Sequence, residues 1–330
     1  MRILFWGTPA FAVPSLRALD DEGFHIVGVV TQPDRPAGRG RRLRPSPVKE
    51  VALQSGFEVF TPDRPRTDEF IEQIRALEPD ISVVVAYGHI LKPVVLDVPR
   101  LGSINVHASL LPELRGAAPI NWAIARGHEK TGITIMRMAE GMDAGAIIHQ
   151  VEEPILSDET AGELTLRLSE VGAMALIEAL ALMGVGQAIE VEQDHEAATF
   201  APKIDRSTAE IDWARPAVRI ANLVRAMDPS PGAWTTLYGS SLKLFRPSVW
   251  SEDELLASPV RLPATNGGAP VQVEGAAPGT VLLADANTGV LVRAGDGAVA
   301  FAEVQPPGKK RMSAADWVNG RGIEVGVKLG

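Results

Sequence analysis

Runs of apolar, mostly β-branched residues alternate with helix-like segments through the first 130 residues, and this alternation limits the fold more than any other feature. The runs lie at 2–6, 25–31, 80–87 and 103–107, and the helical patterns lie at 10–22, 46–55, 67–77 and 117–126. Apolar strands separated by helices are typical of βαβ units, whose parallel sheet is covered on both faces. The sequence therefore predicts an α/β domain with a Rossmann-like, doubly wound, mainly parallel sheet.

The rest of the chain changes character twice. A strand pair is expected at 132–138 and 144–155, and a long amphipathic helix at 159–183. Residues 187–205 are irregular and are interpreted as a linker. After a helix at 213–227, short strands separated by Gly, Asn and Asp turns predict a small all-β barrel or sandwich.

The predicted organisation is therefore two domains joined by a linker. The α/β domain covers 1–186, the linker 187–205 and the smaller β domain 206–330. Inside the β domain, a stretch rich in Pro, Ala and Gly at 251–278 is interpreted as a surface excursion that is partly mobile. The sequence SAADWVNG at 313–320 predicts a short capped helix.

Composition excludes several kinds of chemistry and of location. The 330 residues include no cysteine, so disulfides, thiolate metal sites and a cysteine nucleophile are excluded. The apolar start is interrupted by Gly-Thr-Pro at 7–9, which is too early for a signal peptide, and no run approaches the roughly 20 residues of a membrane span. We therefore expect a cytoplasmic protein without a membrane partner.

Charge is unevenly distributed along the chain. The net charge is -9, but residues 206–330 hold 13 basic and 12 acidic side chains, so the remainder, with 19 basic and 29 acidic side chains, carries the excess of -10. Inside that acidic part, residues 35–49 contain six basic side chains and no acidic one. The whole-protein charge argues weakly against a nucleic-acid partner, whereas the local cluster points the other way.

The loop after the first predicted strand does not match a dinucleotide-binding fingerprint. Residues 7–12 read GTPAFA, with one glycine where the fingerprint needs three for close approach of the pyrophosphate and for helix packing. Gly7 is better explained as a tight turn into a helix, so nicotinamide binding is not expected.

Asn105 and His107 end the strand SINVH and form the first candidate site. Residues two apart on a strand point to the same face, and open α/β sheets place their ligands at the carboxyl ends of the strands. An amide and an imidazole together can hold a developing oxyanion and exchange a proton, as attack on a carbonyl requires. The alternative is structural, with Asn105 capping a turn and His107 hydrogen-bonded in the core.

Asp143 in GMDAG follows the next predicted strand and strengthens this candidate. The nearby glycines permit a tight turn that can bring the carboxylate into a site, although an Asx-turn between two strands explains them equally. If Asp143 reaches His107, it should raise the pKa of the imidazole and orient the ring.

No serine lies in a nucleophile elbow and no histidine pair has zinc spacing. Direct transfer without a covalent intermediate or a metal is the remaining chemistry.

Two basic clusters suggest an anionic ligand. The loop 32–49 follows the second strand, at the same sheet edge, and a second cluster, KKR, lies at 309–311. A charge run is commonly a solvated loop, but two clusters on different domains favour a long polyanion. The basic side chains concerned are Arg39, Arg41, Arg42, Arg44, Lys49, Lys309, Lys310 and Arg311.

At the level of whole motifs, the chain resembles the methionyl-tRNA formyltransferases from end to end. The segments that carry the resemblance are GTPAFAVPSL, TQPDRPAGRGRRLRPSPVK, VVVAYGHIL, LGSINVHASLLPELRGAAPINWAI, TGITIMRMAEGMDAG, IDW and PPGKKRMSAADW. The INVHASLLP and Gly-x-Asp-x-Gly blocks are shared with a wider set of folate-dependent enzymes. The basic loop and the C-terminal β domain are particular to the tRNA enzymes, although the stretch at 251–278 is longer than is usual for them.

This resemblance implies transfer of a formyl group from 10-formyltetrahydrofolate to the α-amine of methionine on initiator tRNA, in support of translation initiation. It implies that Asn105 and protonated His107 stabilise the oxyanion, and that Asp143 holds His107 and helps to move the proton. The folate-contacting segment corresponds to Ser109, Leu110, Leu111 and Pro112. The basic loop is implied to meet the acceptor end of the tRNA, with Arg39 most associated with that contact.

For the C-terminal domain the resemblance implies an OB-like barrel that grips tRNA, with Lys309, Lys310 and Arg311 as backbone contacts. No metal is implied, and a monomer is expected.

Three alternatives remain open. A formyltransferase acting on a nucleotide sugar or a purine precursor should lack the basic loop and the barrel. A hydrolase of 10-formyltetrahydrofolate usually carries an N-terminal regulatory domain, whereas here the catalytic pattern begins at residue 1. A tRNA-binding module built on an inactive enzyme is disfavoured by the intact Asn105, His107 and Asp143.

Overall fold

The structure is a computed structural model that describes residues 1–37, 42–257, 275–285, 287 and 289–330. Its contacts divide the chain into two compact units. Unit 1 consists of Met1–Pro119, Lys130–Pro154 and Glu163–Pro202. Unit 2 consists of Ile120–Glu129, Ile155–Gly162 and Lys203–Gly330. Two short segments therefore belong to unit 2 before residue 203, and the chain from Lys203 onward belongs to unit 2 throughout.

Unit 1 is built on a seven-stranded sheet in the order β10-β9-β7-β6-β1-β2-β5, within the described residues. The strands are β1 Arg2–Gly7, β2 His25–Val30, β5 Val59–Phe60, β6 Ile81–Val85, β7 Ser103–His107, β9 Lys130–Arg137 and β10 Ile147–Pro154. Pairing is parallel from β7 to β5, and antiparallel where β9 joins β7 and β10 joins β9. The mainly parallel, doubly wound sheet predicted from the sequence is confirmed.

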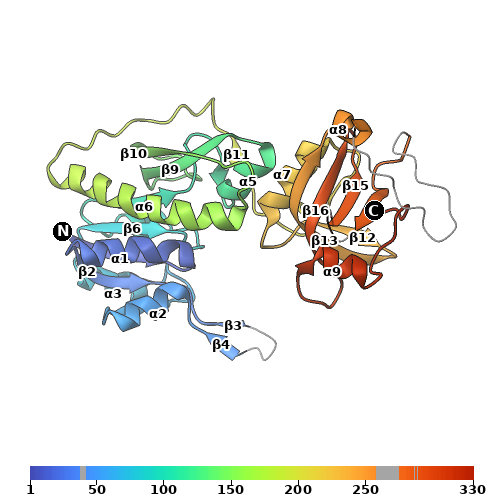
Figure 1. The fold of residues 1–330 in the computed structure, drawn as a ribbon. Coiled ribbons are helices and arrows are strands. Elements are labelled where there is room, and N and C mark those ends of the chain that lie inside the picture. Colours follow the sequence, from blue (N-terminus) through green and yellow to red (C-terminus); the bar gives the residue numbers. More distant parts are fainter. Residues whose placement is uncertain (38–41, 258–274, 286, 288) are drawn as a thin grey trace. The chain divides into compact units, whose positions relative to one another are not determined.

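Helices cover both faces of this sheet (Figure 1). A 3₁₀ turn at Ala10–Ala12 leads into α1 Val13–Asp21, and the further helices are α2 Pro47–Gln54, α3 Asp68–Ala76, α4 Pro93–Leu96 and α6 Ala161–Gly184. The hydroxyls of Ser46 and Thr67 accept the backbone N–H groups that open α2 and α3, because serine and threonine are strong N-cap residues. On one face α6 packs so closely that a Cβ at Gly172 would lie 3.2 Å from Val106.

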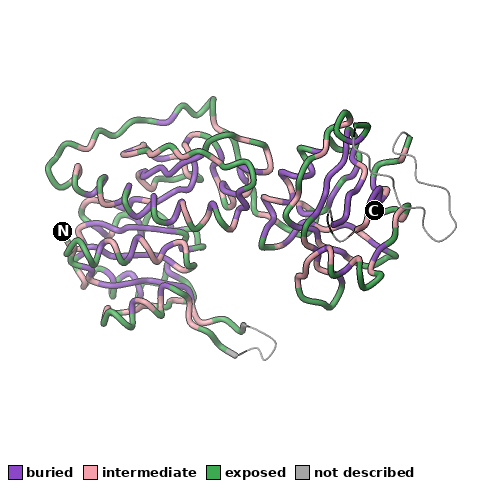
Figure 2. Tube along the Cα trace, in the orientation of Figure 1, coloured by how far each residue is buried: buried purple, intermediate pink, exposed green. Residues whose placement is uncertain are grey.

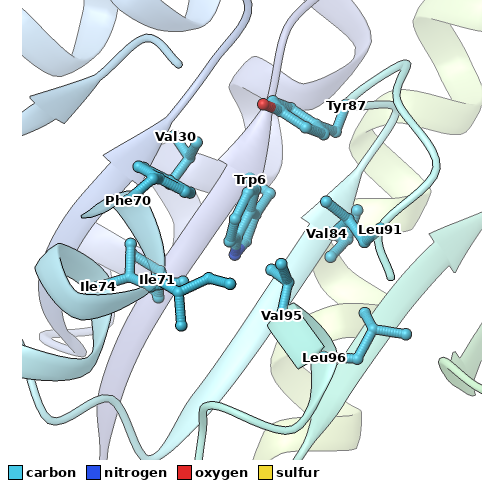
Figure 3. Packing of buried hydrophobic residues seen from close by; sticks show 11 residues of the cluster. Trp6, Val30, Phe70, Ile71, Ile74, Val84, Tyr87, Leu91, Val95 and Leu96 are labelled. Atoms are coloured by element: carbon cyan, nitrogen blue, oxygen red, sulfur yellow. The ribbon is translucent and has the colours of Figure 1, made fainter. Parts of the chain in front are cut away.

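The opposite face of the sheet packs on α3 and α4 around Trp6. Figure 3 shows the Trp6 ring between Phe70 of α3 and Tyr87 beyond β6, and the ring centroids lie 5.9 and 5.2 Å apart in edge-to-face geometry. The indole N–H donates to Ser82 Oγ at 3.1 Å, so the buried polar atom is satisfied. Strands β1, β6, β7 and β9 are buried along nearly their whole length (Figure 2), which explains their continuous apolar runs, whereas the edge strand β10 is mostly half-buried or exposed.

The basic loop 32–49, interpreted from the sequence as a loop, contains regular structure. β3 Arg35–Ala37 and β4 Arg42–Arg44 pair antiparallel, with Pro36 opposite Leu43. Proline is tolerated here because both strands are edge strands, so its missing N–H interrupts no central ladder. Arg39, Arg41 and the glycines at 38 and 40 lie outside the described residues.

Unit 2 contains a curled antiparallel sheet in the order β12-β13-β16-β15-β14, with β17 paired to β16. Its strands are β12 Trp234–Leu237, β13 Ser240–Trp250, β14 Val281–Asp285, β15 Gly289–Arg293, β16 Ala298–Gln305 and β17 Met312–Ser313. The C-terminal tail bonds to both edges of the sheet: Val327 O accepts from Val281 N of β14, and Gly330 N donates to Thr236 O of β12. Both edge strands are therefore partly covered.

Helices complete unit 2. They are α5 Pro119–Arg126, which enters the unit at Ile120, α7 Ala217–Met227, α8 Glu252–Ala257 and α9 Ala314–Asn319. Ser313 caps α9, as expected for a short capped helix. The excursion predicted at 251–278 begins differently from the expectation, because Glu252–Ala257 is helical and Leu255 of α8 is buried against β14 and β15. Residues 258–274 lie outside the description.

The segment interpreted as a linker, 187–205, is packed into unit 1 as far as Pro202. Val191 exchanges backbone hydrogen bonds with Ile147 at 2.8 Å, and β11 Phe200–Ala201 pairs in parallel with β8 Arg115–Gly116. This segment is irregular by secondary structure but fixed by long-range contacts. Across the described ranges, no helix combines the length and the apolar character that crossing a membrane requires.

Candidate active site

The carboxyl end of β7 presents Asn105 and His107 on one face of the sheet. The same face carries Ser103, whose hydroxyl donates to the Leu96 carbonyl of α4 at 2.9 Å, so this is the face covered by α3 and α4. Asn105 is half-buried, and its side-chain amide makes no hydrogen bond to any residue in the described part of the chain. An amide without an internal partner at a sheet edge is suited to bind a polar ligand atom.

His107 is buried and is held by one of its two ring nitrogens. Nε2 lies 3.1 Å from the Leu114 carbonyl oxygen. A carbonyl can only accept, so Nε2 carries a hydrogen and donates it. The proton that His107 can gain or lose is therefore on Nδ1, and Nδ1 faces the Asp143 carboxylate, with Oδ2 at 3.7 Å. That separation is longer than a hydrogen bond, so the Asp143 carboxylate attracts a proton on Nδ1 by its charge without a hydrogen bond to it.

Burial lowers the pKa of His107 below its ordinary value of 6.5, while the charge of Asp143 and the hydrogen bond to Leu114 act in the opposite direction. The sequence leads to the expectation that Asp143 raises this pKa. Asp143 does act in that direction, but desolvation of a ring only 5% exposed outweighs it. The net result is a lowered pKa for the His107 imidazole.

Asp143 lies in a tight turn whose backbone leaves little freedom. Its own φ is +49°, in the left-handed region. At Gly145 a Cβ would lie 2.0 Å from the Arg137 carbonyl oxygen, so only glycine fits where the turn meets β9. The carboxylate accepts a hydrogen bond from the Gly116 backbone N–H at 2.8 Å. Gly116 belongs to β8, so two separate segments orient the carboxylate toward His107.

The predicted folate segment, residues 109–112, is firmly held by its own unit. Ser109 Oγ donates to the Glu113 carbonyl at 2.6 Å, and the Leu111 N–H donates to Thr134 Oγ1 at 3.1 Å. The side chains of Ser109 and Leu111 are buried, whereas Leu110 and Pro112 are partly exposed. Ser109 and Leu111 shape the loop, and Leu110 and Pro112 offer apolar surface.

The predicted basic residues of the first cluster differ in their surroundings. Lys49 Nζ binds Asp34 Oδ1 at 2.7 Å, and a Thr31–Ser46 hydroxyl pair at 2.7 Å joins the same two ends of the loop. Lys49 thus anchors the root of the hairpin. Arg44 is exposed. Arg39 and Arg41 lie outside the described residues, as does the side chain of Arg42.

The second basic cluster divides in the same way. Lys309 and Lys310 are exposed. Arg311 instead donates to both carboxylate oxygens of Asp228, at 2.6 and 3.0 Å, pairs with Glu303, and stacks over the Phe245 ring at 4.0 Å. Since Asp228 is buried, Arg311 is engaged in holding unit 2 together.

Sequence reasoning missed the backbone groups of Leu114 and Gly116, and also Gln193, whose side chain reaches the Asp143 turn from the supposed linker. No periodicity marks these groups, because backbone atoms have no sequence signature and Gln193 stands in an irregular polar segment. No group of three or more His, Asp or Glu side chains that could hold a metal ion is found within the described residues.

The doubly wound sheet presents an amide and a buried imidazole at the carboxyl end of β7, and the Asp143 carboxylate faces the imidazole. Comparison with protein families identifies the class of protein that carries this site. The chain matches the formyl transferase family over residues 1–180 and the formyl transferase C-terminal domain over residues 203–322.

Full-length relatives narrow the class. The chain is 48% identical over 329 residues to a methionyl-tRNA formyltransferase of Symbiobacterium thermophilum, covering 100% of this chain and 95% of the relative. It is 44% identical to the Bacillus subtilis enzyme of the same name, covering 100% and 98%. The chain therefore belongs to the methionyl-tRNA formyltransferase family.

Solved structures share the fold at lower identity. HypX from Aquifex aeolicus in complex with tetrahydrofolic acid has a TM-score of 0.61 at 19% identity, over 96% of this chain and 46% of that one. A methionyl-tRNA formyltransferase from Clostridium thermocellum has a TM-score of 0.55 at 17% identity, over 75% and 93%. WlaRD, a sugar 3N-formyl transferase, has a TM-score of 0.62 at 17% identity, over 94% and 99%.

Proposed function

We propose that this chain transfers the formyl group of 10-formyltetrahydrofolate to the α-amine of methionine on initiator methionyl-tRNA, with Asn105, His107 and Asp143 as its catalytic residues. The observation that carries the proposal is the pair formed by His107 Nδ1 and Asp143 at the carboxyl edge of the sheet, with Nε2 already committed to Leu114. Because Nε2 is occupied, this arrangement supports Nδ1 as the ring nitrogen that gains and loses a proton during the reaction. Family membership supports the substrates.

The chemistry is a direct amine attack. The amine nitrogen bonds to the formyl carbon, and negative charge develops on the formyl oxygen. The Asn105 amide and protonated His107 stabilise that oxyanion, because donors aimed at a developing charge lower the barrier most in a water-poor site. The bond from carbon to the folate nitrogen then breaks, and the proton lost by the amine passes to that nitrogen with the help of the His107–Asp143 pair.

The formyl donor fits the residues beside this site. Leu110 and Pro112 offer partly exposed apolar surface suited to a flat pterin ring, and Ser109 and Leu111 keep their segment in place through the bonds to Glu113 and Thr134. The donor is a co-substrate, and no metal is required by the proposed steps.

Binding of tRNA is assigned to the exposed basic residues of both units, because phosphate contacts need accessible cations. Among the described residues these are Arg44, Lys309 and Lys310. Arg39, Arg41 and Arg42 are assigned to the same role from their place in the sequence alone. Lys49 and Arg311 are assigned to anchoring instead. For unit 2 we propose an OB-like barrel, supported by the tail that bonds to both β12 and β14.

A monomer is proposed as the active form. A reaction on initiator tRNA would place the protein in the cytoplasm. The residues before and after 187–205 are proposed to act as the formyl-donor domain and the tRNA-binding domain, respectively.

The deciding experiment is acid-gel mobility of methionylated initiator tRNA after incubation with the protein and 10-formyltetrahydrofolate. Wild type should formylate the tRNA, and His107→Ala should not, even at saturating tRNA. Folate consumption without formylation would identify a hydrolase or another amine acceptor. If the folate also stays intact, the chain is an inactive, tRNA-binding member of the family.

A further inference from the structure

The Asp143 turn is held by a glutamine from the segment 187–205. Gln193 Nε2 donates to the carbonyl oxygen of Asp143 at 2.9 Å and to that of Gly145 at 2.7 Å. One amide group therefore bridges the two carbonyls on either side of the turn's Ala144. Gln193 is 5% exposed, and a donor so buried leaves little freedom to the groups it binds.

Gln193 is in turn held by a buried arginine. The Gln193 Oε1 atom accepts two hydrogen bonds from Arg115, from Nε at 3.1 Å and Nη2 at 2.6 Å. Nη2 also donates to His195 Nδ1 at 3.0 Å. An arginine only donates and a carbonyl only accepts, so the amide can be oriented in one way only. Hydrogen bonds from a charged donor are stronger than neutral ones, which fixes Gln193 firmly.

Arg115 also precedes the residue that binds the Asp143 carboxylate. The Gly116 N–H donates to Asp143 Oδ2, and the Arg115 N–H donates to the Thr199 carbonyl at 2.9 Å. At Gly116, with φ of +122°, a Cβ would lie 2.7 Å from the Ala201 carbonyl oxygen. The segment 191–201 thus holds both sides of the carboxylate: the turn that carries it and the strand that donates to it.

We propose that Gln193, fixed by Arg115, is a positioning residue for formyl transfer, which holds the Asp143 turn so that the carboxylate faces His107 Nδ1. This inference rests on the proposed function. Gln193 does not touch the reacting atoms; it acts through Asp143. The segment that reads as a linker is by this reasoning part of the catalytic apparatus of unit 1.

The test compares Gln193→Met and Gln193→Glu with wild type. Methionine keeps the volume and removes both donors. Glutamate keeps the interaction with Arg115, and therefore the fold, but turns an oxygen toward the two carbonyls. The matched control is Glu192→Gln, which changes the exposed neighbouring side chain.

We expect kcat to fall about tenfold to a hundredfold in both Gln193 variants, because small displacements of a catalytic group have effects of this size. KM for both substrates should change less than about twofold, as expected when positioning rather than binding is impaired.

A pH profile separates positioning from general loss of structure. Without the facing carboxylate, His107 should hold its proton less well, so the limb in which kcat falls with rising pH should move to lower pH in Gln193→Met. A merely structural defect would lower kcat by the same factor at every pH. That result, or unchanged kcat in both Gln193 variants, would overturn the proposal.

A second measurement does not depend on activity. The His107 ring proton resonance, assigned with His107→Asn, should titrate at lower pH in Gln193→Met than in wild type and in Glu192→Gln. An unchanged titration would refute the positioning role. If wild type fails to formylate tRNA while the titration moves as expected, the proposed function is wrong and the positioning of Asp143 stands.

Discussion

The catalytic edge of unit 1 and the two basic segments hold their charged groups in different ways. At the edge, His107 is fixed by the Leu114 carbonyl and Asp143 by the Gly116 N–H, so each group has a partner from another part of the chain. The exposed cations Arg44, Lys309 and Lys310 have no such restraint from the residues that the structure describes.

Each basic segment nevertheless contains a cation that is held by an acidic partner. Lys49 is paired with Asp34 and Arg311 with Asp228. A basic cluster in a sequence therefore combines two kinds of residue. Some anchor the segment through an acidic partner, and others remain accessible to a polyanion. Proton transfer needs fixed geometry, whereas attraction to phosphates needs accessible charge.

The strongest effect is expected at the fixed geometry. Asp143→Asn removes the charge that faces His107 Nδ1 but keeps an oxygen for the Gly116 N–H. We expect kcat to fall by about 10²–10⁴, the usual contribution of a proton-transfer group. Single-turnover formylation at saturating substrates measures it, with the exposed Asp194→Asn as control. Equal rates in the two variants would show that the carboxylate has no catalytic role.

The next largest effect is expected on the stability of unit 2, when the anchoring Arg311 is replaced. Arg311→Met leaves the buried Asp228 carboxylate without its partner, and loss of one member of such a pair costs about 3 kcal/mol of unfolding free energy. Urea denaturation should show this loss, whereas Lys310→Met should change stability by less than about 0.5 kcal/mol. Similar stability of both variants would erase the proposed distinction between anchored and accessible cations.

Acid should weaken the fold through His107. Because burial lowers the pKa of His107 in the folded state, the unfolded chain binds the proton more readily, and stability falls as the pH drops below the ordinary value of 6.5. For one proton the slope is at most about 1.4 kcal/mol per pH unit. Comparing wild type with His107→Asn from pH 7.5 downward isolates this contribution. Parallel curves for the two proteins would contradict it.

A smaller effect is expected for the accessible cations. In the double variant Lys309→Ala/Lys310→Ala, tRNA should bind several-fold more weakly while kcat at saturation stays unchanged. The slope of log binding constant against log salt should become less steep by about 2, because each lysine that no longer neutralises a phosphate lowers it by about one unit. Filter binding across a salt series tests this, and an unchanged slope would exclude both lysines from the tRNA interface.

The weakest effect is expected at a buried hydroxyl that has no partner in the part of the chain that the structure describes. The Tyr87 hydroxyl is buried without a hydrogen bond among the described residues, and burial raises the pKa of the phenol to about 12. Tyr87→Phe removes an unsatisfied group and keeps the ring against Trp6, so stability should rise by up to about 1 kcal/mol. A clear decrease in stability on thermal unfolding would mean that the hydroxyl is satisfied in solution.

Much of the fold could be predicted because its signals are local. The apolar runs that became β1, β2, β6 and β7 are recognisable within a few residues of sequence. The basic hairpin and helix α8 were missed, since short elements beside Pro and Gly have weak local signals and depend on pairing and burial. In the site, Asn105, His107 and Asp143 could be named from residue type and position, but their partners could not.

Residue types and their spacing are enough to predict the main strands and helices of unit 1, the polar groups at the carboxyl end of β7, and membership of the methionyl-tRNA formyltransferase family. Packing in three dimensions sets which nitrogen of His107 exchanges its proton, and brings Gln193 to Asp143 from 50 residues away. It also makes Arg311 an anchor. The physical reason is the distance along the chain over which each effect acts. Periodicity and turn chemistry depend on residues close in sequence, whereas tertiary packing determines which distant groups become hydrogen-bond partners.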